Sequence, residues 1–181
     1  MSHRNRFPLI RAKHAAFALM AAPSLAVANP SWECLEPALE AELAQKLNFQ
    51  AGFAAAIVEA RPDLEEAAGI AADATNESFK IRFARTVWLW QVDPGRFSDA
   101  DAFWVFAWSD EDEAAWRAAD PSHLAAADRV DALRNRFRSL ATADAYRSFV
   151  SENRTEEPFL GLATDFGDAL AADRARVADC F

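Results

Sequence analysis

Few side chains in this sequence are of the types that carry acid–base or metal chemistry. Histidine, which titrates closest to neutral pH, occurs three times, and His3 and His14 lie within the first 28 residues. His123 stands alone in the remainder, and one histidine cannot form a two-histidine metal site. It follows Pro121 in the expected first turn of a helix, where a solvated polar residue is ordinary. The sequence therefore predicts no metal centre and favours a solvated His123 over a catalytic one.

Motifs that bind cofactors or mark nucleophiles do not occur in the sequence. It contains no C-x-x-C-H, no P-loop and no G-x-G-x-x-G, so we expect no cofactor. Without a G-x-S-x-G elbow, nothing marks the serine of a Ser-His-Asp triad. The acidic run from Asp110 to Glu113 lacks the alternating spacing and central glycine of a calcium loop. We interpret it as the acidic first turn of a helix, where carboxylates complement the helix dipole.

Glu77 is the carboxylate with the best claim to a catalytic role. Together with Ser78, it is similar to the Glu-Ser dipeptide that bears the catalytic acid of lysozyme-like transglycosylases. The resemblance implies a carboxylate-dependent hydrolase of cell-wall glycan with Glu77 as the acid. The Gly-Leu-Met-Gln segment of that family has no counterpart here, and no spacing identifies a second carboxylate as partner. A glutamate near a helix start also has a simpler use as a cap.

Aromatic side chains are concentrated in one stretch of the chain. Between Phe79 and Trp116, 10 of 38 positions are Phe or Trp, which is enough to build either a core of large rings or a groove lined by them. A groove of this kind would suit an amphipathic partner, a sugar face or an apolar peptide. The tryptophans that would line it are Trp88, Trp90, Trp104 and Trp108.

Arginines form a second cluster on an otherwise acidic chain. The planar guanidinium pairs bidentately with carboxylates, so the first interpretation is pairing with the chain's own surplus acids. The alternative is an anionic ligand or partner, for which Arg134 and Arg138 are the candidate contacts. The cluster consists of Arg129, Arg134, Arg136, Arg138 and Arg147.

The elements that must position these side chains follow a leader segment. Residues 1–28 comprise a basic stretch, an apolar run and the small-residue triplet Ala26-Val27-Ala28, the order typical of a cleavable signal peptide. The apolar run is interrupted by Pro23 and falls short of the ~20 residues that a membrane-spanning helix needs. We therefore expect cleavage after Ala28, no stable membrane span afterwards, and a periplasmic or secreted product.

Removal of the leader makes the chain more acidic. The remaining residues, 29–181, carry 15 Lys and Arg against 28 Asp and Glu. The length of this segment suits a single helical domain. Such a surface repels phosphate backbones and anionic lipids, so we expect binding neither to nucleic acid nor to membrane surfaces.

The two cysteines lie near opposite ends of the expected mature chain. In an oxidising compartment, Cys34 and Cys180 are placed to tie the termini together. Closing a loop of this length is worth roughly 4 to 5 kcal/mol in the chain-entropy model. Two free thiols and an intermolecular pair are the alternatives. No metal-type or C-x-x-C spacing is present, which favours the structural disulfide.

Regularly spaced prolines and abundant alanine predict an all-α fold, an irregular bundle of about seven short helices. The first helix is expected to begin at Pro37 and end near Asn48, and a later one to fade at Thr75 and Asn76. From Phe79 the pattern is mixed between strand and helix, and we choose helix. No oligomeric state follows from the sequence.

The second half of the chain carries clearer helix signals. Ser98 is expected to cap a helix running through Trp108, apolar on all sides and central to the bundle. The remaining starts are expected at the Ser109 and Asp112 capping box, at Asp120 before Pro121, at Thr142 and, after a loop around Pro158 and Gly161, at Thr164. The core stripe of the helix after Pro121 is expected to be Leu124, Val130, Leu133, Phe137 and Leu140.

With no convergent catalytic set and a dense aromatic region, the sequence favours a non-enzymatic binding or protein-interaction module outside the cytoplasm. Its expected partners are an envelope protein, a peptide or a small apolar ligand. The glycan hydrolase with Glu77 as its acid is the alternative.

Overall fold

The computed structural model describes residues 30–181, and the regular secondary structure in that range is entirely helical. This confirms the predicted all-α fold, while the expected leader, residues 1–28, lies outside the described residues. Within the described range, no helix is both long enough and apolar enough to cross a bilayer. The helices are α1 (Trp32–Ala60), α2 (Glu65–Val92), α3 (Ala100–Trp104), α4 (Asp110–Ala119), α5 (Pro121–Ser139), α6 (Ala143–Asn153) and α7 (Phe159–Ala178), with single 3₁₀ turns η1 (Pro62–Leu64) and η2 (Pro94–Arg96).

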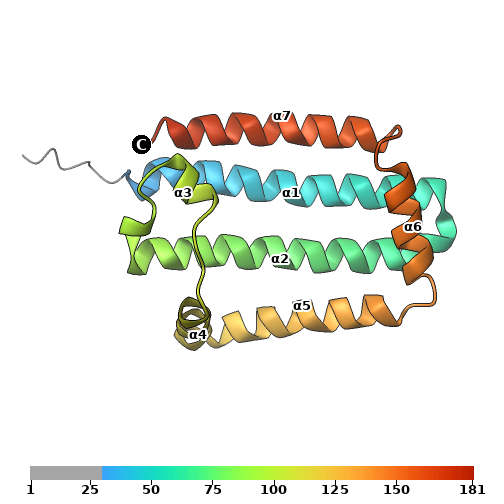
Figure 1. Ribbon diagram of the computed structural model, residues 1–181, viewed down its shortest axis with the longest axis horizontal. Helices are drawn as coiled ribbons and strands as arrows, with labels where there is room; N and C mark the ends of the chain where they lie inside the picture. The colour runs from blue at the N-terminus through green and yellow to red at the C-terminus, as the bar shows by residue number, and fades with distance from the viewer. Residues whose placement is uncertain (1–29) are drawn as a thin grey trace, which may run out of the picture.

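Four long helices lie side by side in the order α7, α1, α2, α5, each antiparallel to its neighbours (Figure 1). The helix α6 crosses one end of this row, and α3 and α4 lie at the other. The two helices inside the row each pack on two long neighbours, whereas α5 has a long neighbour only in α2. The short helices α4 and α6 therefore flank the space between α2 and α5 at its two ends.

Buried side chains form separate clusters along the row. The first, at the end that holds both termini of the helical row, contains Leu35, Leu89, Phe97, Phe103 and Val177 among its members. The second lies near the α1–α2 turn and includes Ile57, Leu64 and Phe159. The third joins α2, α4 and α5 and consists of Ile81, Trp116 and Val130.

The first two helices are longer than expected, at 29 and 28 residues. The breaks expected near Asn48 and at Thr75 and Asn76 do not occur. Asn48 is exposed on α1, and the Thr75 hydroxyl donates a 2.8 Å hydrogen bond to the carbonyl of Ala71 on the preceding turn. Poor helix propensity costs at most ~0.7 kcal/mol at such positions. Packing against two neighbouring helices outweighs that cost.

The start of α1 also differs from the prediction. The helix begins at Trp32, where the Ser31 hydroxyl accepts a 3.3 Å hydrogen bond from the backbone N–H of Cys34. Pro37 therefore lies inside the helix and not at its beginning. Its missing N–H removes one intrahelical bond, to the carbonyl of Glu33, and α1 continues because it packs on both α2 and α7.

The expected central helix from Ser98 to Trp108 is wrong. Asp99 caps instead, accepting a 2.8 Å hydrogen bond from the Ala102 N–H, and α3 ends after five residues. Residues 105–109 are not helical, and this lets the rings of Phe106 and Trp108 both turn towards the core. On an α-helix, residues two positions apart are separated by roughly 200° around the axis, so the two rings would point in nearly opposite directions.

Two of the predicted helix starts are confirmed by their hydrogen bonds. The Ser109 hydroxyl accepts from the Asp112 N–H at 3.1 Å, and the Asp112 carboxylate accepts from the Ser109 N–H at 2.9 Å, completing the capping box. At the next start, the Asp120 carboxylate accepts from the Ser122 N–H at 2.7 Å, with Pro121 in the first helical position.

Three details of the C-terminal half differ from expectation. Thr142 occupies the cap position of α6 without a side-chain capping bond. The last helix begins at Phe159, so Gly161 and Thr164 lie within it, and the Thr164 hydroxyl donates to the Leu160 carbonyl at 2.9 Å. Leu124, expected in the core stripe of α5, is 46% exposed because it lies ~100° around the helix from His123, the residue of that turn that packs on Trp116.

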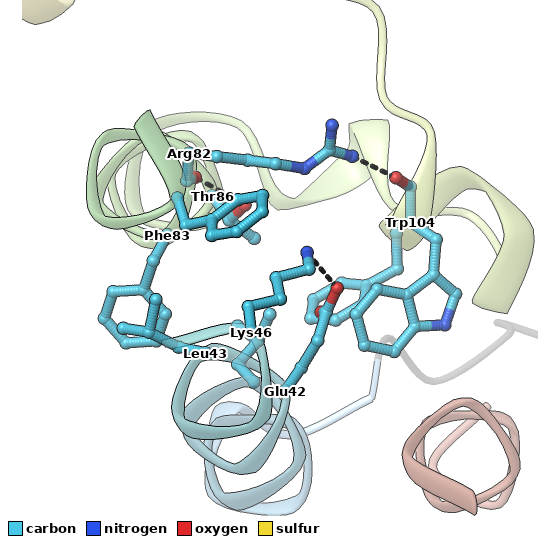
Figure 2. Close-up of a pocket in the computed structure, with 10 residues that line it drawn as sticks. Glu42, Leu43, Lys46, Arg82, Phe83, Thr86 and Trp104 are labelled. Atoms are coloured by element: carbon cyan, nitrogen blue, oxygen red, sulfur yellow. Dashed lines mark hydrogen bonds and ion pairs between the residues drawn. The ribbon is translucent and has the colours of Figure 1, made fainter. Parts of the chain in front are cut away.

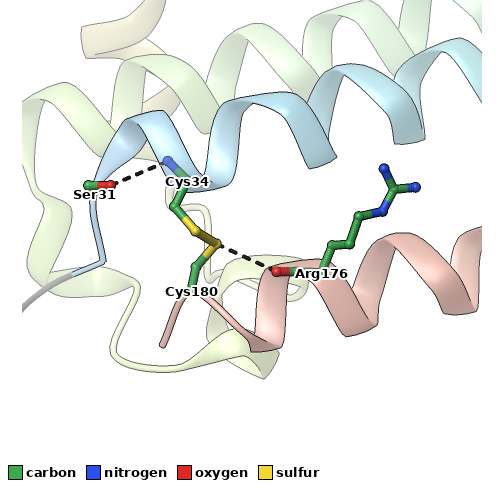
Figure 3. The surroundings of a disulfide bond; sticks show 4 residues. All are labelled: Ser31, Cys34, Arg176 and Cys180. Carbon is green, nitrogen blue, oxygen red and sulfur yellow. Dashed lines mark hydrogen bonds between the residues drawn. A yellow bond between two sulfur atoms is a disulfide. The ribbon is translucent and has the colours of Figure 1, made fainter.

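The predicted bond between Cys34 and Cys180 is present, with the sulfurs 2.03 Å apart and the Cα atoms 5.9 Å apart. It joins the first turn of α1 to the second residue past the end of α7 (Figure 3). The Sγ of Cys180 also lies 3.5 Å from the carbonyl oxygen of Arg176. The disulfide therefore ties the outer helix of the row to its neighbour.

Candidate functional site

A groove of about 750 Å³ lies between α2 and α5. Its floor comes from small side chains of α2, its wall from the facing side of α5, and one residue of α6 closes an end. The residues that line it are Ala71, Ala74, Thr75 and Ser78 of α2, Asp131, Arg134, Phe137 and Arg138 of α5, and Arg147 of α6.

The groove exists because side chains fill the space between the two helices unevenly. Near α4, the gap between them is packed by Ile81, Val130 and the fully buried Trp116. Further along, α2 lines the gap with the small side chains of Ala71, Ala74, Thr75 and Ser78. Side chains of that size leave the space between two helix axes unfilled.

Two of the arginines in the groove come from adjacent turns of α5. Nη1 of Arg134 lies 3.9 Å from the Asp131 carboxylate, a pair in which both side chains are more than half exposed. The Arg138 guanidinium donates to the Arg134 carbonyl at 3.3 Å and to the Asn135 side-chain oxygen at 2.6 Å, and it makes no ion pair with any described residue. Both guanidinium groups are therefore at most weakly neutralised.

Arg147 adds a third positive charge from the end of the groove. Its guanidinium lies 5.4 Å from the centre of the Phe137 ring and pairs with Asp144, whose side chain is almost fully exposed. The lining thus holds three guanidinium groups and one carboxylate, that of Asp131. On a strongly acidic chain this makes a local positive region, and its concave walls focus the field.

The other two arginines of the sequence cluster lie outside this groove and pair with α2. Arg129 lies 3.9 Å from Glu77, and Arg136 lies 2.9 Å from Glu66. For these two residues, the interpretation as partners of the chain's own acids fits the structure. The five arginines therefore divide into two groups with different surroundings.

Glu77 is held between two cations. Its Oε1 lies 2.8 Å from Nζ of Lys80, and its Oε2 lies 3.9 Å from Arg129. A hollow of about 230 Å³ beside it is lined by Glu77, Ser122, Ala125, Ala126 and Arg129. The structure brings no second carboxylate into that lining, although glycoside hydrolysis uses a pair.

The four tryptophans proposed for a groove are all partly buried and pack against core clusters. The ring centres of Trp88 and Trp108 lie 5.8 Å apart between two clusters, and Trp90 packs in a tilted arrangement against Trp32 and Phe97. Trp104 covers a cavity of about 20 Å³ between α1 and α2, which holds roughly one water. Figure 2 shows that its indole nitrogen points away from this cavity.

The same small cavity has a polar rim formed by α1 and α2 (Figure 2). Glu42 and Lys46 form an ion pair one turn apart on α1, and the Arg82 guanidinium donates to the Trp104 carbonyl. The Arg82 contact holds α3 over the row of long helices. Both contacts occupy polar groups that a ligand would otherwise meet.

His123 is not a solvated residue. Its ring stacks on Trp116 with centroids 4.3 Å apart, and its Nδ1 lies 2.7 Å from the Trp116 carbonyl oxygen. The ring is therefore part of the α4–α5 packing. Among residues 30–181, no group of three or more His, Cys, Asp or Glu side chains is arranged to hold a metal ion.

The sequence did not predict the floor of the groove or the contribution of Arg147 to its lining. A signal was available, since residues 71–75 read Ala-Ala-Asp-Ala-Thr and place small side chains on successive turns of α2. Which helix faces that stretch is set by the tertiary fold. Comparisons with protein-family models, with curated proteins and with solved structures give no match for this chain.

Proposed function

We propose that this protein is an exported, non-enzymatic binding protein that holds an anionic ligand in the groove between α2 and α5. The observation that supports this most is the charge of the lining, three guanidinium groups against the single carboxylate of Asp131, on a chain rich in acids. Carboxylates, phosphates and sulfonates are the groups that guanidinium recognises best.

Arg134 and Arg138 are suited to act together because residues four apart on a helix are neighbours on its surface. Arg138 now donates to a neutral amide oxygen and to a backbone carbonyl, bonds that a charged ligand could replace with stronger ones. Arg147 approaches from α6, so the ligand would meet donors from two elements. No covalent step is part of this proposal.

The export half of the proposal is supported by the Cys34–Cys180 disulfide, a bond that persists in oxidising compartments. Its test is the mass of the protein purified from the envelope or medium of its own cells. We expect a chain that begins at Asn29 with both cysteines oxidised. An intact N-terminus with two reduced thiols would overturn this half.

The binding half is tested with a pair of fluorescent dyes that differ in one group. The probe is 8-anilinonaphthalene-1-sulfonate, and its match is N-phenyl-1-naphthylamine, which has the same rings without the sulfonate. We expect saturable binding of the sulfonate dye at least tenfold tighter than binding of the neutral dye, since each charge-assisted contact contributes about 1.5 kcal/mol or more. Arg134→Gln/Arg138→Gln should remove that difference.

The control is Arg129→Gln/Arg136→Gln, which removes the same charge from the same helix outside the groove. It should bind the sulfonate dye as the unmodified protein does. Circular dichroism and thermal melting verify that each variant is folded. If both double variants lose the same amount of binding, net charge and not the groove explains it, and the proposal is wrong.

A further inference from the structure

We infer that the anion is an amphiphile, a carboxylate head held by Arg134 and Arg138 with a short apolar chain laid on the floor formed by α2. This inference rests on the proposed function, because it names the ligand class of the same groove. Three features carry it: the largely apolar floor, the arginine side chain at each end, and the pair of guanidinium groups that α5 places beside the floor.

The floor of the groove is largely apolar. It presents the methyl groups of Ala71 and Ala74 and the side chains of Thr75 and Ser78, and on the facing wall α5 adds the ring of Phe137. The Thr75 and Ser78 hydroxyls already donate to the carbonyls of Ala71 and Ala74, so neither offers a ligand a free donor. A compact polar anion such as phosphate would leave these surfaces wet, whereas a hydrocarbon chain would take them out of water.

An arginine side chain stands at each end of the groove. At one end, Nη2 of Arg134 reaches across from α5 to within 3.4 Å of the Ser78 hydroxyl on α2. At the other end, Arg147 of α6 stands over Phe137. The stretch of α2 between Ala71 and Ser78 is ~10 Å long at the rise of an α-helix. A partner helix would have to cross these side chains, while a short chain fits between them.

Two of the three guanidinium groups in the lining come from the same helix. Arg134 and Arg138 project from α5, and α2 contributes no charged side chain to the lining. A single anionic head on a hydrocarbon chain matches both the guanidinium pair of α5 and the floor formed by α2. The Asp131 carboxylate beside Arg134 disfavours a second negative charge on the ligand at that place.

The inference is tested by calorimetric titration of the oxidised protein with three compounds: acetate, octanoate and octanol. Acetate shares the head of octanoate, octanol shares its chain length, and the octanoate chain is about as long as the groove, ~10 Å. We expect octanoate to bind at least tenfold more tightly than either of the others. In Arg134→Gln/Arg138→Gln, octanoate should bind no better than octanol.

A second variant tests the floor. Ala71→Leu fills part of the groove and should weaken octanoate at least fivefold without weakening acetate. Ala132→Leu is the matched control, because it makes the same substitution at an exposed site on α5 outside the lining. It should leave octanoate binding unchanged. If Ala71→Leu does not fold, the comparison of the three compounds on the unmodified protein still decides the matter.

The outcomes separate this inference from the proposed function. Equal binding of acetate and octanoate, lost in Arg134→Gln/Arg138→Gln, would overturn the amphiphile and leave the anion site standing. Tight binding of a glutamate-rich peptide with none of octanoate would overturn it in favour of a macromolecular partner. Equal binding of octanol and octanoate, together with unchanged sulfonate-dye binding in Arg134→Gln/Arg138→Gln, would overturn both.

Discussion

The indole nitrogen of Trp108 donates a 2.9 Å hydrogen bond to Oε2 of Glu113, the same oxygen that pairs with the Arg85 guanidinium. Arg85 lies 5.0 Å from the ring centres of both Trp108 and Trp116, so a cation on α2 sits between rings of the α3–α4 segment and of α4. Arg117 completes the group with a 2.6 Å contact to Oε1 of Glu113. This group attaches α4 to the row of long helices.

Replacing Glu113 by Gln should lower the free energy of unfolding by about 2 kcal/mol, because it removes a partly buried charge that neutralises Arg85 and Arg117. Urea unfolding at neutral pH measures the change. The control is Glu111→Gln in the same turn, where the side chain is exposed and the loss should stay below about 0.5 kcal/mol. Equal losses in the two variants would contradict the role assigned to Glu113.

The contribution of Glu113 should depend on pH. Burial alone would raise its pKa, but hydrogen bonds from Arg117 and Trp108 and the charge of Arg85 hold the pKa below its ordinary value of 4.5. Since the folded pKa lies below the unfolded one, the stabilisation is complete above about pH 4.5 and is lost as pH falls through the folded pKa. The gap in unfolding free energy between the unmodified protein and Glu113→Gln should therefore narrow below pH 4.5. A gap that stays constant in acid would be evidence against this ion pair.

Replacing Ser109 by Ala removes the hydroxyl half of the capping box at the start of α4. The expected loss is about 1 kcal/mol, the usual effect of deleting a helix N-cap. Thermal melting measures it, and Ser109→Asp should restore most of the stability because aspartate also caps. Ser98→Ala provides the comparison, since Ser98 does not cap α3 and its loss should be small.

Replacing Cys34 and Cys180 by Ser should lower the unfolding free energy by roughly 4 to 5 kcal/mol, because the bond closes a loop across 146 positions of sequence. The measurement is denaturant unfolding of both proteins with and without reductant. Reductant should destabilise the unmodified protein and leave the double variant unchanged. A double variant as stable as the oxidised protein would show that the tie between α1 and α7 does not limit unfolding.

Replacing Phe97 by Ala should cost about 3 to 5 kcal/mol, the range for removing a fully buried ring. Phe97 has no exposed surface and lies within 6 Å of Trp90, Phe103 and Phe106, at 5.5, 5.5 and 5.7 Å between ring centres. Phe181→Ala is the control, because that ring is 38% exposed and should cost little. If both variants melt alike, the aromatic region is not the core that its packing indicates.

Features that depend on neighbours within three residues could be predicted from the sequence. The caps at Ser109 and Asp120 are of this kind, because each side chain bonds to a backbone N–H two or three positions later. The disulfide was also predictable, since the chain has only two cysteines. The continuity of α1 past Asn48 was not, because packing on neighbouring helices overrides a weak local preference.

The candidate site shows the same division. The sequence proposed Arg134 and Arg138 as candidate contacts of an anion. It did not show that Arg136 would meet Glu66, 70 positions away, while Arg138 would make no ion pair with a described residue. That difference arises only when α5 packs on α2. The sequence alone determines the composition, the helix caps and the cysteine pair, because these depend on near neighbours or on the number of residues of one type. The groove depends on which helix faces the small residues of α2, and the packing of the whole core determines that long-range arrangement.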